Sequence, residues 1–234
     1  MKIITWNCNM AFRKKVDLLL RYKPDLLIIP ECEHADKIIF PAPPTSAIWY
    51  GDNQNKGLGV FSFGNYRLEL LIHHEPSLKT ILPIAVSGDN MNFTLFAIWA
   101  NNPQDKGNQY VGQIWKAIHL YEDLITSERT VLIGDFNSNS IWDKPRRVGN
   151  HTTLVEKLAL KQIKSVYHHY FDQAHGSEQH PTFNLYKNAN KPYHLDYCFV
   201  SKDIMLKLVK IQVGTYGDWK KYSDHLPLII DFNF

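Results

Sequence analysis

The sequence predicts an α/β protein in which two mixed β-sheets pack together and helices cover their outer surfaces. Short apolar runs of strand length alternate with amphipathic stretches that have helical spacing. Several strand-like runs in the first half follow one another without an intervening helix, which argues against a purely parallel, doubly wound sheet. The 234 residues, 44% of them hydrophobic, suffice for one substantial core and are few for two domains. We therefore expect one domain over residues 1–234.

Eight segments have the apolar content and the length that are typical of strands. They are Lys2–Trp6, Asp25–Ile29, Gly57–Phe63, Thr80–Val86, Phe93–Ala100, Thr130–Ile133, Tyr197–Val200 and Leu226–Phe232. Stretches rich in Gly, Pro, Asn and Ser interrupt the periodicity and predict loops. These loops are Pro41–Pro44, Asn101–Gly107, Asn137–Asn150, His175–Pro181 and Tyr186–Tyr193.

Three segments place apolar side chains three or four residues apart, as on one face of a helix. They are Arg13–Tyr22, Gln109–Thr126 and Thr152–Lys161. In the last of them, Leu154 and Leu158 mark the apolar face. We expect all three to be amphipathic helices that pack on the sheets.

The composition excludes some classes of protein. No apolar run approaches the roughly 18 residues of a membrane helix, and the N-terminus has a strand-like pattern instead of a signal-peptide core, so we expect a cytoplasmic protein without a membrane partner. We favour a monomer. The formal charge is only +3, so attraction to a polyanion must come from local basic clusters. The irregular spacing of Cys8, Cys32 and Cys198 indicates reduced core thiols. The pairs His73–His74 and His168–His169 have no metal-ligand partner at useful spacing, and we expect surface or core histidines.

Polar residues stand at the ends of several predicted strands. A strand end can hold a side chain rigidly and still leave it open to solvent, so residues gathered there can form one preorganised site. The residues at such ends are Asn7, Glu31, Asp135, Asn137, Asp224 and His225.

These residue types suggest a site for Mg²⁺ or Mn²⁺, because both ions prefer oxygen ligands and are commonly held by one or two carboxylates. Glu31 and Asp224 are the candidate ligands, and Asp135 is the candidate to orient or deprotonate an attacking water. Each residue taken alone also has a structural interpretation. Asn7 could be a turn residue, and Glu31 could cap the segment that follows it.

Five motifs occur in an order that resembles the endonuclease/exonuclease/phosphatase (DNase I-like) superfamily. They are TWN at Thr5–Asn7, PE at Pro30–Glu31, GDFN at Gly134–Asn137, LDY at Leu195–Tyr197 and SDHLPL at Ser223–Leu228. The resemblance spans nearly the whole chain. It implies a four-layer α/β sandwich, with two packed mixed β-sheets flanked by helices and the active site at one end of the sheets.

The resemblance also implies roles for the motif residues. Asn7 would position the metal-binding carboxylate or the substrate, while Glu31 and Asp224 would contact the metal. Asp135 and Asn137 would orient the nucleophilic water and the phosphate.

The same resemblance implies that Asp196 hydrogen-bonds His225. A carboxylate on one imidazole nitrogen fixes the tautomer and favours the protonated ring, which can bind a phosphate oxygen. One position departs from the family, which often has Tyr or His at the end of the strand before GDFN, where this chain has Trp99. Either Trp99 packs in the core and Asn101 or Asn102 contacts the phosphate, or the pocket is built differently.

The segment SIWDKPRR follows GDFN and bears on the substrate. Trp142 beside Arg146 and Arg147 suits a stacked nucleobase with its flanking phosphates. The alternative is a solvated basic loop that Trp142 anchors to the core.

The sequence as a whole favours a Mg²⁺- or Mn²⁺-dependent phosphodiesterase, namely an endonuclease or exonuclease acting on DNA or RNA. Two alternatives stay open: a phosphatase or phosphodiesterase for a small phosphoester, and a catalytically silent nucleic-acid-binding module. The presence of every acidic motif residue argues against the silent module.

Overall fold

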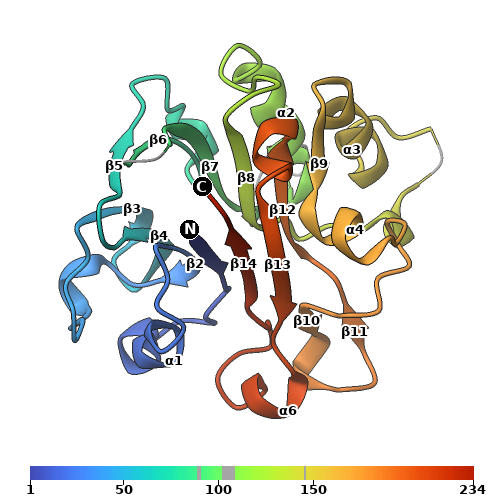
Figure 1. Ribbon diagram of the computed structural model, residues 1–234. Helices are drawn as coiled ribbons and strands as arrows, with labels where there is room; N and C mark the ends of the chain where they lie inside the picture. The colour runs from blue at the N-terminus through green and yellow to red at the C-terminus, as the bar shows by residue number, and fades with distance from the viewer. Residues whose placement is uncertain (89–90, 102–108, 145) are drawn as a thin grey trace.

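The computed structural model describes residues 1–88, 91–101, 109–144 and 146–234, and its centre is formed by two six-stranded sheets (Figure 1). The first sheet has the order β13 (Leu208–Val213), β14 (Leu228–Phe232), β1 (Lys2–Thr5), β2 (Leu26–Cys32), β4 (Lys56–Ser62) and β3 (Ser46–Asn53). The second has the order β5 (Arg67–Leu70), β6 (Ile81–Ser87), β7 (Phe93–Trp99), β8 (Thr130–Asp135), β12 (Asp196–Ser201) and β9 (Ile163–Ser165).

Both sheets are mixed. β1 pairs with β2 in parallel, and β7 pairs with β8 in parallel, whereas the other neighbours in the two sheets are antiparallel. A separate hairpin is formed by β10 (Phe183–Asn184) and β11 (Pro192–Tyr193). The prediction of two mixed sheets is therefore confirmed.

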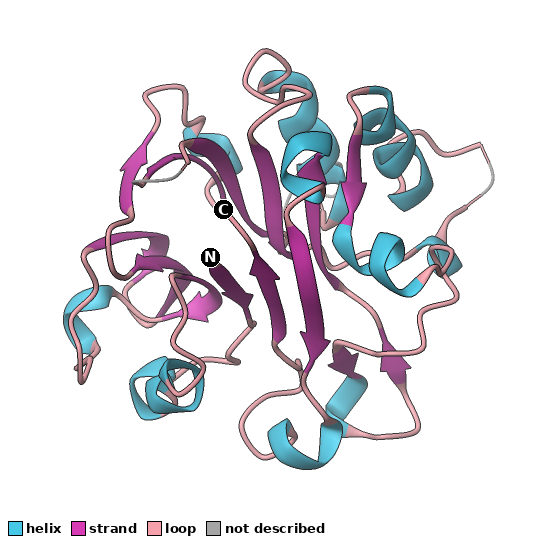
Figure 2. Cartoon of the chain, viewed as in Figure 1, coloured by secondary structure: helices cyan, strands magenta, loops and turns pink. Residues whose placement is uncertain are grey.

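Helices lie outside the sheets, as the peripheral cyan segments in Figure 2 show. The α-helices are α1 (Val16–Leu20), α2 (Val111–Leu120), α3 (His151–Leu160), α4 (Val166–Phe171), α5 (Lys202–Met205) and α6 (Tyr216–Trp219). Short 3₁₀ helices are η1 (Phe12–Lys14), η2 (Ala35–Lys37), η3 (Pro76–Leu78), η5 (Ser140–Trp142) and η6 (Leu185–Lys187). None of these helices has the length and apolarity that crossing a membrane requires.

The alternation of side chains along each strand builds four layers. In β2, Leu26 and Ile28 enter the core between the two sheets, whereas Leu27 and Ile29 enter a second core beneath α1. A third core joins the outer face of β7, β8 and β12 to α2 and α3. Because both faces of the central strands are covered, their sequences are nearly continuous apolar runs.

All eight predicted strands are present, but two predicted helices differ from the structure. The segment expected as a helix over Gln109–Thr126 is helical only over Val111–Leu120. Tyr121 and Ile125 continue the apolar face but pack on the core from non-helical turns. The segment Arg13–Tyr22 is split into η1 and α1, because Lys15 lies outside the helical region with φ −131°.

Candidate active site

Strand register brings the sequence motifs to one end of the two sheets. In the first sheet, β1 and β2 end where β14 begins, since Thr5 pairs with Leu228. In the second sheet, Asp135 at the end of β8 pairs with Asp196 at the start of β12. Asn7 connects the sheets, because its Nδ2 donates to Asp135 Oδ2 at 3.0 Å.

A cavity of about 820 Å³ opens at this end of the sheets. The predicted site residues in its lining are Asn7, Glu31, Asn101, Asn137, Asp224 and His225. Asp135 and Asp196 are fully buried behind this wall. The structure therefore brings all seven predicted catalytic and metal residues into one constellation.

Glu31 reaches the cavity from an irregular point in β2. The register of β2 against β4 shifts between Pro30 and Cys32, and Glu31 has φ +60°, which is unusual for a residue with a side chain. A bulge of this kind redirects a side chain out of the regular alternation. Asn7 Nδ2 lies 3.4 Å from Glu31 Oε1 and thus links this carboxylate to Asp135.

Asp224 lies in the motif that leads into β14. Asn9 Nδ2 donates to Asp224 Oδ1 at 3.1 Å. Ser223 Oγ donates to the carbonyl of Asn7 at 2.7 Å and accepts from the His225 amide at 3.0 Å. Hydrogen bonds therefore join the motif before β14 to the loop that follows β1.

His225 lies between two buried carboxylates. Its Nδ1 is 2.9 Å from Asp196 Oδ2, and its Nε2 is 3.9 Å from Asp135 Oδ2. Burial by itself would lower the pKa of His225, but the nearby Asp196 and Asp135 carboxylates outweigh it and raise the pKa to about 10. The two carboxylates therefore favour the protonated form of the imidazole. The implied contact between Asp196 and His225 is present in the structure.

The GDFN turn fixes Asp135 and Asn137 in a single arrangement. The Asn137 amide donates to Asp135 Oδ1 at 3.0 Å, and Asn137 Nδ2 donates to Asp135 Oδ2 at 3.0 Å and to the Ala100 carbonyl at 2.8 Å. Gly134 has φ +143°, and a Cβ there would lie 1.9 Å from the Ile98 carbonyl oxygen. Burial raises the pKa of Asp135, against the opposing effect of His225, which makes it a better proton acceptor than an ordinary carboxylate.

The donor set fits a hard divalent cation. Glu31 and Asp224 are carboxylates on the wall of one cavity, which matches the few protein oxygens that Mg²⁺ or Mn²⁺ needs beside water and phosphate. Asp135, Asp196 and His225 also place one potential ligand atom each within 4.8 Å of one another. A protonated His225 has no lone pair for a metal, so this buried triad is better described as an ion-paired group.

The residues proposed to contact substrate lie at different distances from the cavity. Asn101 lines it, but its amide is engaged by Thr80 and Gln113. Asn102 lies outside the described residues. Trp99 is 8% exposed; it belongs to the core and also forms part of the cavity wall. Trp99 therefore packs in the core as expected, whereas the phosphate contact of Asn101 or Asn102 stays a prediction.

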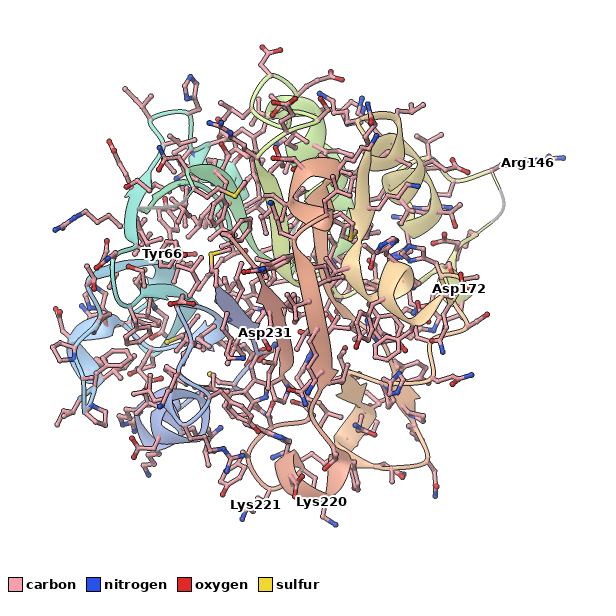
Figure 3. The ribbon with its side chains drawn as sticks, in the orientation of Figure 1. Tyr66, Arg146, Asp172, Lys220, Lys221 and Asp231 are labelled. Carbon is pink, nitrogen blue, oxygen red and sulfur yellow. The ribbon has the colours of Figure 1, made fainter. Side chains whose placement is uncertain are left out.

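Trp142 and Arg147 line a smaller cavity of about 210 Å³ that adjoins the main one, since both cavities are lined by Tyr110 and Asn137. The Trp142 ring is 48% exposed and lies 4.9 Å from the ring of Tyr193. Arg146 is not part of this wall. Figure 3 shows its side chain projecting away from the molecule at the tip of its loop.

Sequence spacing missed a half-buried cluster behind the GDFN loop. The sequence spacing indicated no metal-ligand partner for His168, but in the structure its Nε2 lies 3.0 Å from Glu178 Oε1, and its ring stacks on that of His175 with centroids 3.5 Å apart. These three residues offer potential metal ligands. However, stacked imidazoles do not both direct an in-plane lone pair at one ion, and Gly176 and Asn139 also donate to Glu178.

This histidine cluster supports the segment that follows the catalytic turn. His151 Nδ1 lies 2.9 Å from Ser138 Oγ, and its Nε2 lies 2.9 Å from His175 Nδ1. Burial lowers the pKa of His151 to about 4 and that of His175 to about 3, so both rings are neutral in the folded protein near pH 7. The cluster is a hydrogen-bonded support for the loop.

Comparison with known proteins gives a family and a fold. A profile described as the Endonuclease/Exonuclease/phosphatase family matches residues 4–225. A search of curated proteins found no match.

Several solved structures share the fold over the whole chain. A 3′ phosphatase NExo from Neisseria, bound to a product DNA hairpin, has a TM-score of 0.72 at 19% identity, with 100% of both chains covered. An AP endonuclease from Archaeoglobus fulgidus has a TM-score of 0.71 at 17% identity, also with 100% of both chains covered. The AP endonuclease LMAP from Leishmania major has a TM-score of 0.72 at 15% identity, and the match covers 100% of this chain and 87% of the LMAP chain.

Proposed function

Because the chain belongs to the endonuclease/exonuclease/phosphatase family, it is a phosphoester-hydrolysing enzyme, and we propose that it is a divalent-metal-dependent nuclease acting on DNA. The observation that carries the proposal is the imidazole of His225, which Asp196 holds at 2.9 Å at the wall of a cavity that Glu31 and Asp224 also line. A cation next to metal-type carboxylates suits an anionic phosphoester, which needs positive charge on more than one side.

His225 binds the phosphate in this mechanism. Its Nδ1 is engaged by Asp196, whereas its Nε2 is beyond hydrogen-bond distance from Asp135 and is free to donate to a non-bridging phosphate oxygen. The buried carboxylate fixes the ring orientation before substrate arrives.

Asp135 accepts a proton from the attacking water. Asn7 and Asn137 hold its two oxygens, and burial raises its pKa toward the range in which a carboxylate serves as a general base. The water oxygen attacks phosphorus, and the bond from phosphorus to the leaving oxygen breaks. A divalent cation held by Glu31 and Asp224 would supply Lewis-acid stabilisation of the charge on the phosphoryl and leaving oxygens.

Two lines of support favour DNA over a small phosphoester. Similar folds carry the names of AP endonucleases and of a 3′ phosphatase that was solved with a DNA hairpin. The second cavity adds an exposed aromatic ring, Trp142, next to Arg147, which is the combination that stacks a base and binds its phosphate. A small ester would leave this second cavity unused.

The test is a cleavage assay on labelled single-stranded, duplex and abasic DNA, on RNA and on phosphomonoesters, each with Mn²⁺ or EDTA. We expect Mn²⁺-dependent cleavage of DNA. Glu31→Gln should reduce it by about two orders of magnitude or more, because the variant removes a ligand and not a packing group. Asp36→Asn is the control, since Asp36 is an exposed carboxylate in η2.

The outcomes separate the alternatives. Turnover of phosphomonoesters alone would refute the nuclease and leave a small-molecule phosphatase. Oligonucleotide binding that survives Glu31→Gln, with no turnover of any substrate, would identify a silent binding module. Equal cleavage with EDTA and with Mn²⁺ would contradict the dependence on metal.

A further inference from the structure

Lys56 lies beside the carboxylate expected to hold the metal. It is the first residue of β4 and lines the main cavity. Its Nζ is 3.2 Å from Glu31 Oε2, and it lies 5.4 Å from the centre of the Trp99 ring, over its face. The side chain is 40% exposed. A cation therefore occupies the cavity side of Glu31, where a metal ion would bind.

The contacts of Glu31 leave little room for two cations. One carboxylate oxygen faces Asn7, and the other faces Lys56. A divalent ion on this carboxylate would bring like charge against the ammonium group and would weaken the pair. The lysine stem is flexible, so the ammonium group can turn away from Glu31 while it stays within the cavity.

Trp99 gives the displaced ammonium group a place near the substrate. A cation over an indole face is stabilised by the ring and does not need a carboxylate partner. Asn137 and His225 line the same cavity as Trp99. An anionic phosphate held by His225 would therefore lie in the same cavity as the Lys56 ammonium group.

We propose that Lys56 is a phosphate-binding residue of this site: its ammonium group neutralises Glu31 in the free enzyme and moves to a non-bridging phosphate oxygen when metal and substrate bind. The inference rests on the proposed function. Lys79 also lines the cavity, but it contacts both oxygens of Asp52, at 2.8 and 2.6 Å, and not a candidate metal ligand.

The proposal requires two effects of opposite sign. Removing the Lys56 charge frees Glu31 and should tighten Mn²⁺ binding in the absence of substrate. The same change removes a phosphate contact and should raise KM for DNA. If Lys56 only supported the hairpin between β3 and β4, its replacement would weaken both Mn²⁺ binding and DNA binding, or would change neither.

The experiment compares Lys56→Gln and Lys56→Arg with the wild-type protein. Mn²⁺ binding is measured without substrate, by the electron paramagnetic resonance signal of free Mn²⁺, and KM and kcat are measured with a labelled DNA oligonucleotide. For Lys56→Gln we expect about threefold to tenfold tighter Mn²⁺ binding and about tenfold higher KM, with a smaller change in kcat. Lys56→Arg should restore most of the KM. Lys157→Gln is the control, because Lys157 forms a 3.2 Å pair with Glu122 on the surface of α3, outside the cavity lining.

Each outcome supports or overturns a stated part of the proposal for Lys56. Unchanged or weaker Mn²⁺ binding by a folded Lys56→Gln variant overturns the competition at Glu31. An unchanged KM overturns the phosphate contact, while wild-type cleavage still upholds the nuclease. If the wild-type protein neither binds Mn²⁺ nor cleaves any substrate, the proposed function fails and the role of Lys56 fails with it. Thermal unfolding of every variant identifies loss of fold.

Discussion

Replacing Asp196 by asparagine should discharge His225 at neutral pH. Asp196 is the partner 2.9 Å from the ring, and the side chain of asparagine has nearly the same shape without the charge. Burial alone lowers the pKa of His225, so the loss of this carboxylate removes the largest influence that opposes burial. The fold should survive, but the group that binds phosphate becomes neutral.

The structure gives a magnitude for this change. The pKa of His225 is about 10 against an ordinary 6.5, and each tenfold change in ionisation is worth about 1.4 kcal/mol. The folded state therefore favours the cation by at most about 5 kcal/mol. Because the folded pKa is raised, this stability is complete below pH 6.5 and is lost as the pH rises through 10, with about 1 kcal/mol left at pH 9.

The assay is urea unfolding of wild-type protein and Asp196→Asn between pH 6 and pH 9. The variant should be less stable by about 3–5 kcal/mol at pH 6, and the difference should shrink toward pH 9. In a His225→Gln background the pH dependence of the difference should disappear, because no imidazole remains. Activity at pH 7 should fall about 100-fold or more, since the phosphate loses a cationic donor.

Nuclear magnetic resonance of the His225 ring nitrogens gives the decisive observation. A native imidazole that titrates near pH 6.5 would refute the reasoning. So would a stability difference that is constant over the whole pH range, because such a difference would reflect packing and not charge.

Three further predictions concern other parts of the molecule. Gly134→Ala should destabilise the protein by about 3 kcal/mol, measured by urea unfolding, because its Cβ collides with backbone at a positive φ; Gly217→Ala, with open space around it, is the control. The pKa values of His151 and His175 are lowered in the folded protein, so the free energy of unfolding is at its full value above pH 6.5 and falls as the pH drops toward 4 and 3. Thermal unfolding measured across this range should show a loss of about 3 kcal/mol between pH 6.5 and pH 5. Trp142→Ala should raise KM for oligonucleotides about tenfold and leave KM for small phosphomonoesters unchanged, because only a base can stack on the ring.

In the two six-stranded sheets, the strands that the sequence predicted are the inner ones and those that it missed lie at the edges; the short β10–β11 hairpin was also missed. β13 and β3 close the first sheet, and β5 and β9 close the second. An edge strand has a neighbour on one side only and can leave much of its surface in water. β5, for instance, alternates exposed with half-buried residues, so Arg67–Leu70 lacks the apolar run that reveals a central strand.

The resemblance to the endonuclease/exonuclease/phosphatase family is confirmed, and the structure groups the motif residues as the resemblance implies. Register explains this success, because a polar residue at the end of a central strand has a fixed position once the strand is paired. Lys56 was missed for the opposite reason. Its contact with Glu31 and Trp99 depends on the bulge in β2 and on the hairpin before β4, and neither leaves a signal in sequence spacing.

Backbone strain at the site connects the fold to the chemistry. Glu31 and Asn137 both have positive φ, which costs free energy for residues with side chains, and both line the cavity. Asn137 recovers part of this cost through hydrogen bonds to Asp135 and Ala100, whereas Glu31 is held by charge and amide contacts from Lys56 and Asn7. The two strained residues therefore differ in what fixes them. Because Lys56 has a flexible stem, the contacts of Glu31 can change when a cation binds. The Asp135–Asn137 turn is held by backbone and amide hydrogen bonds, so it is suited to keep an attacking water in place.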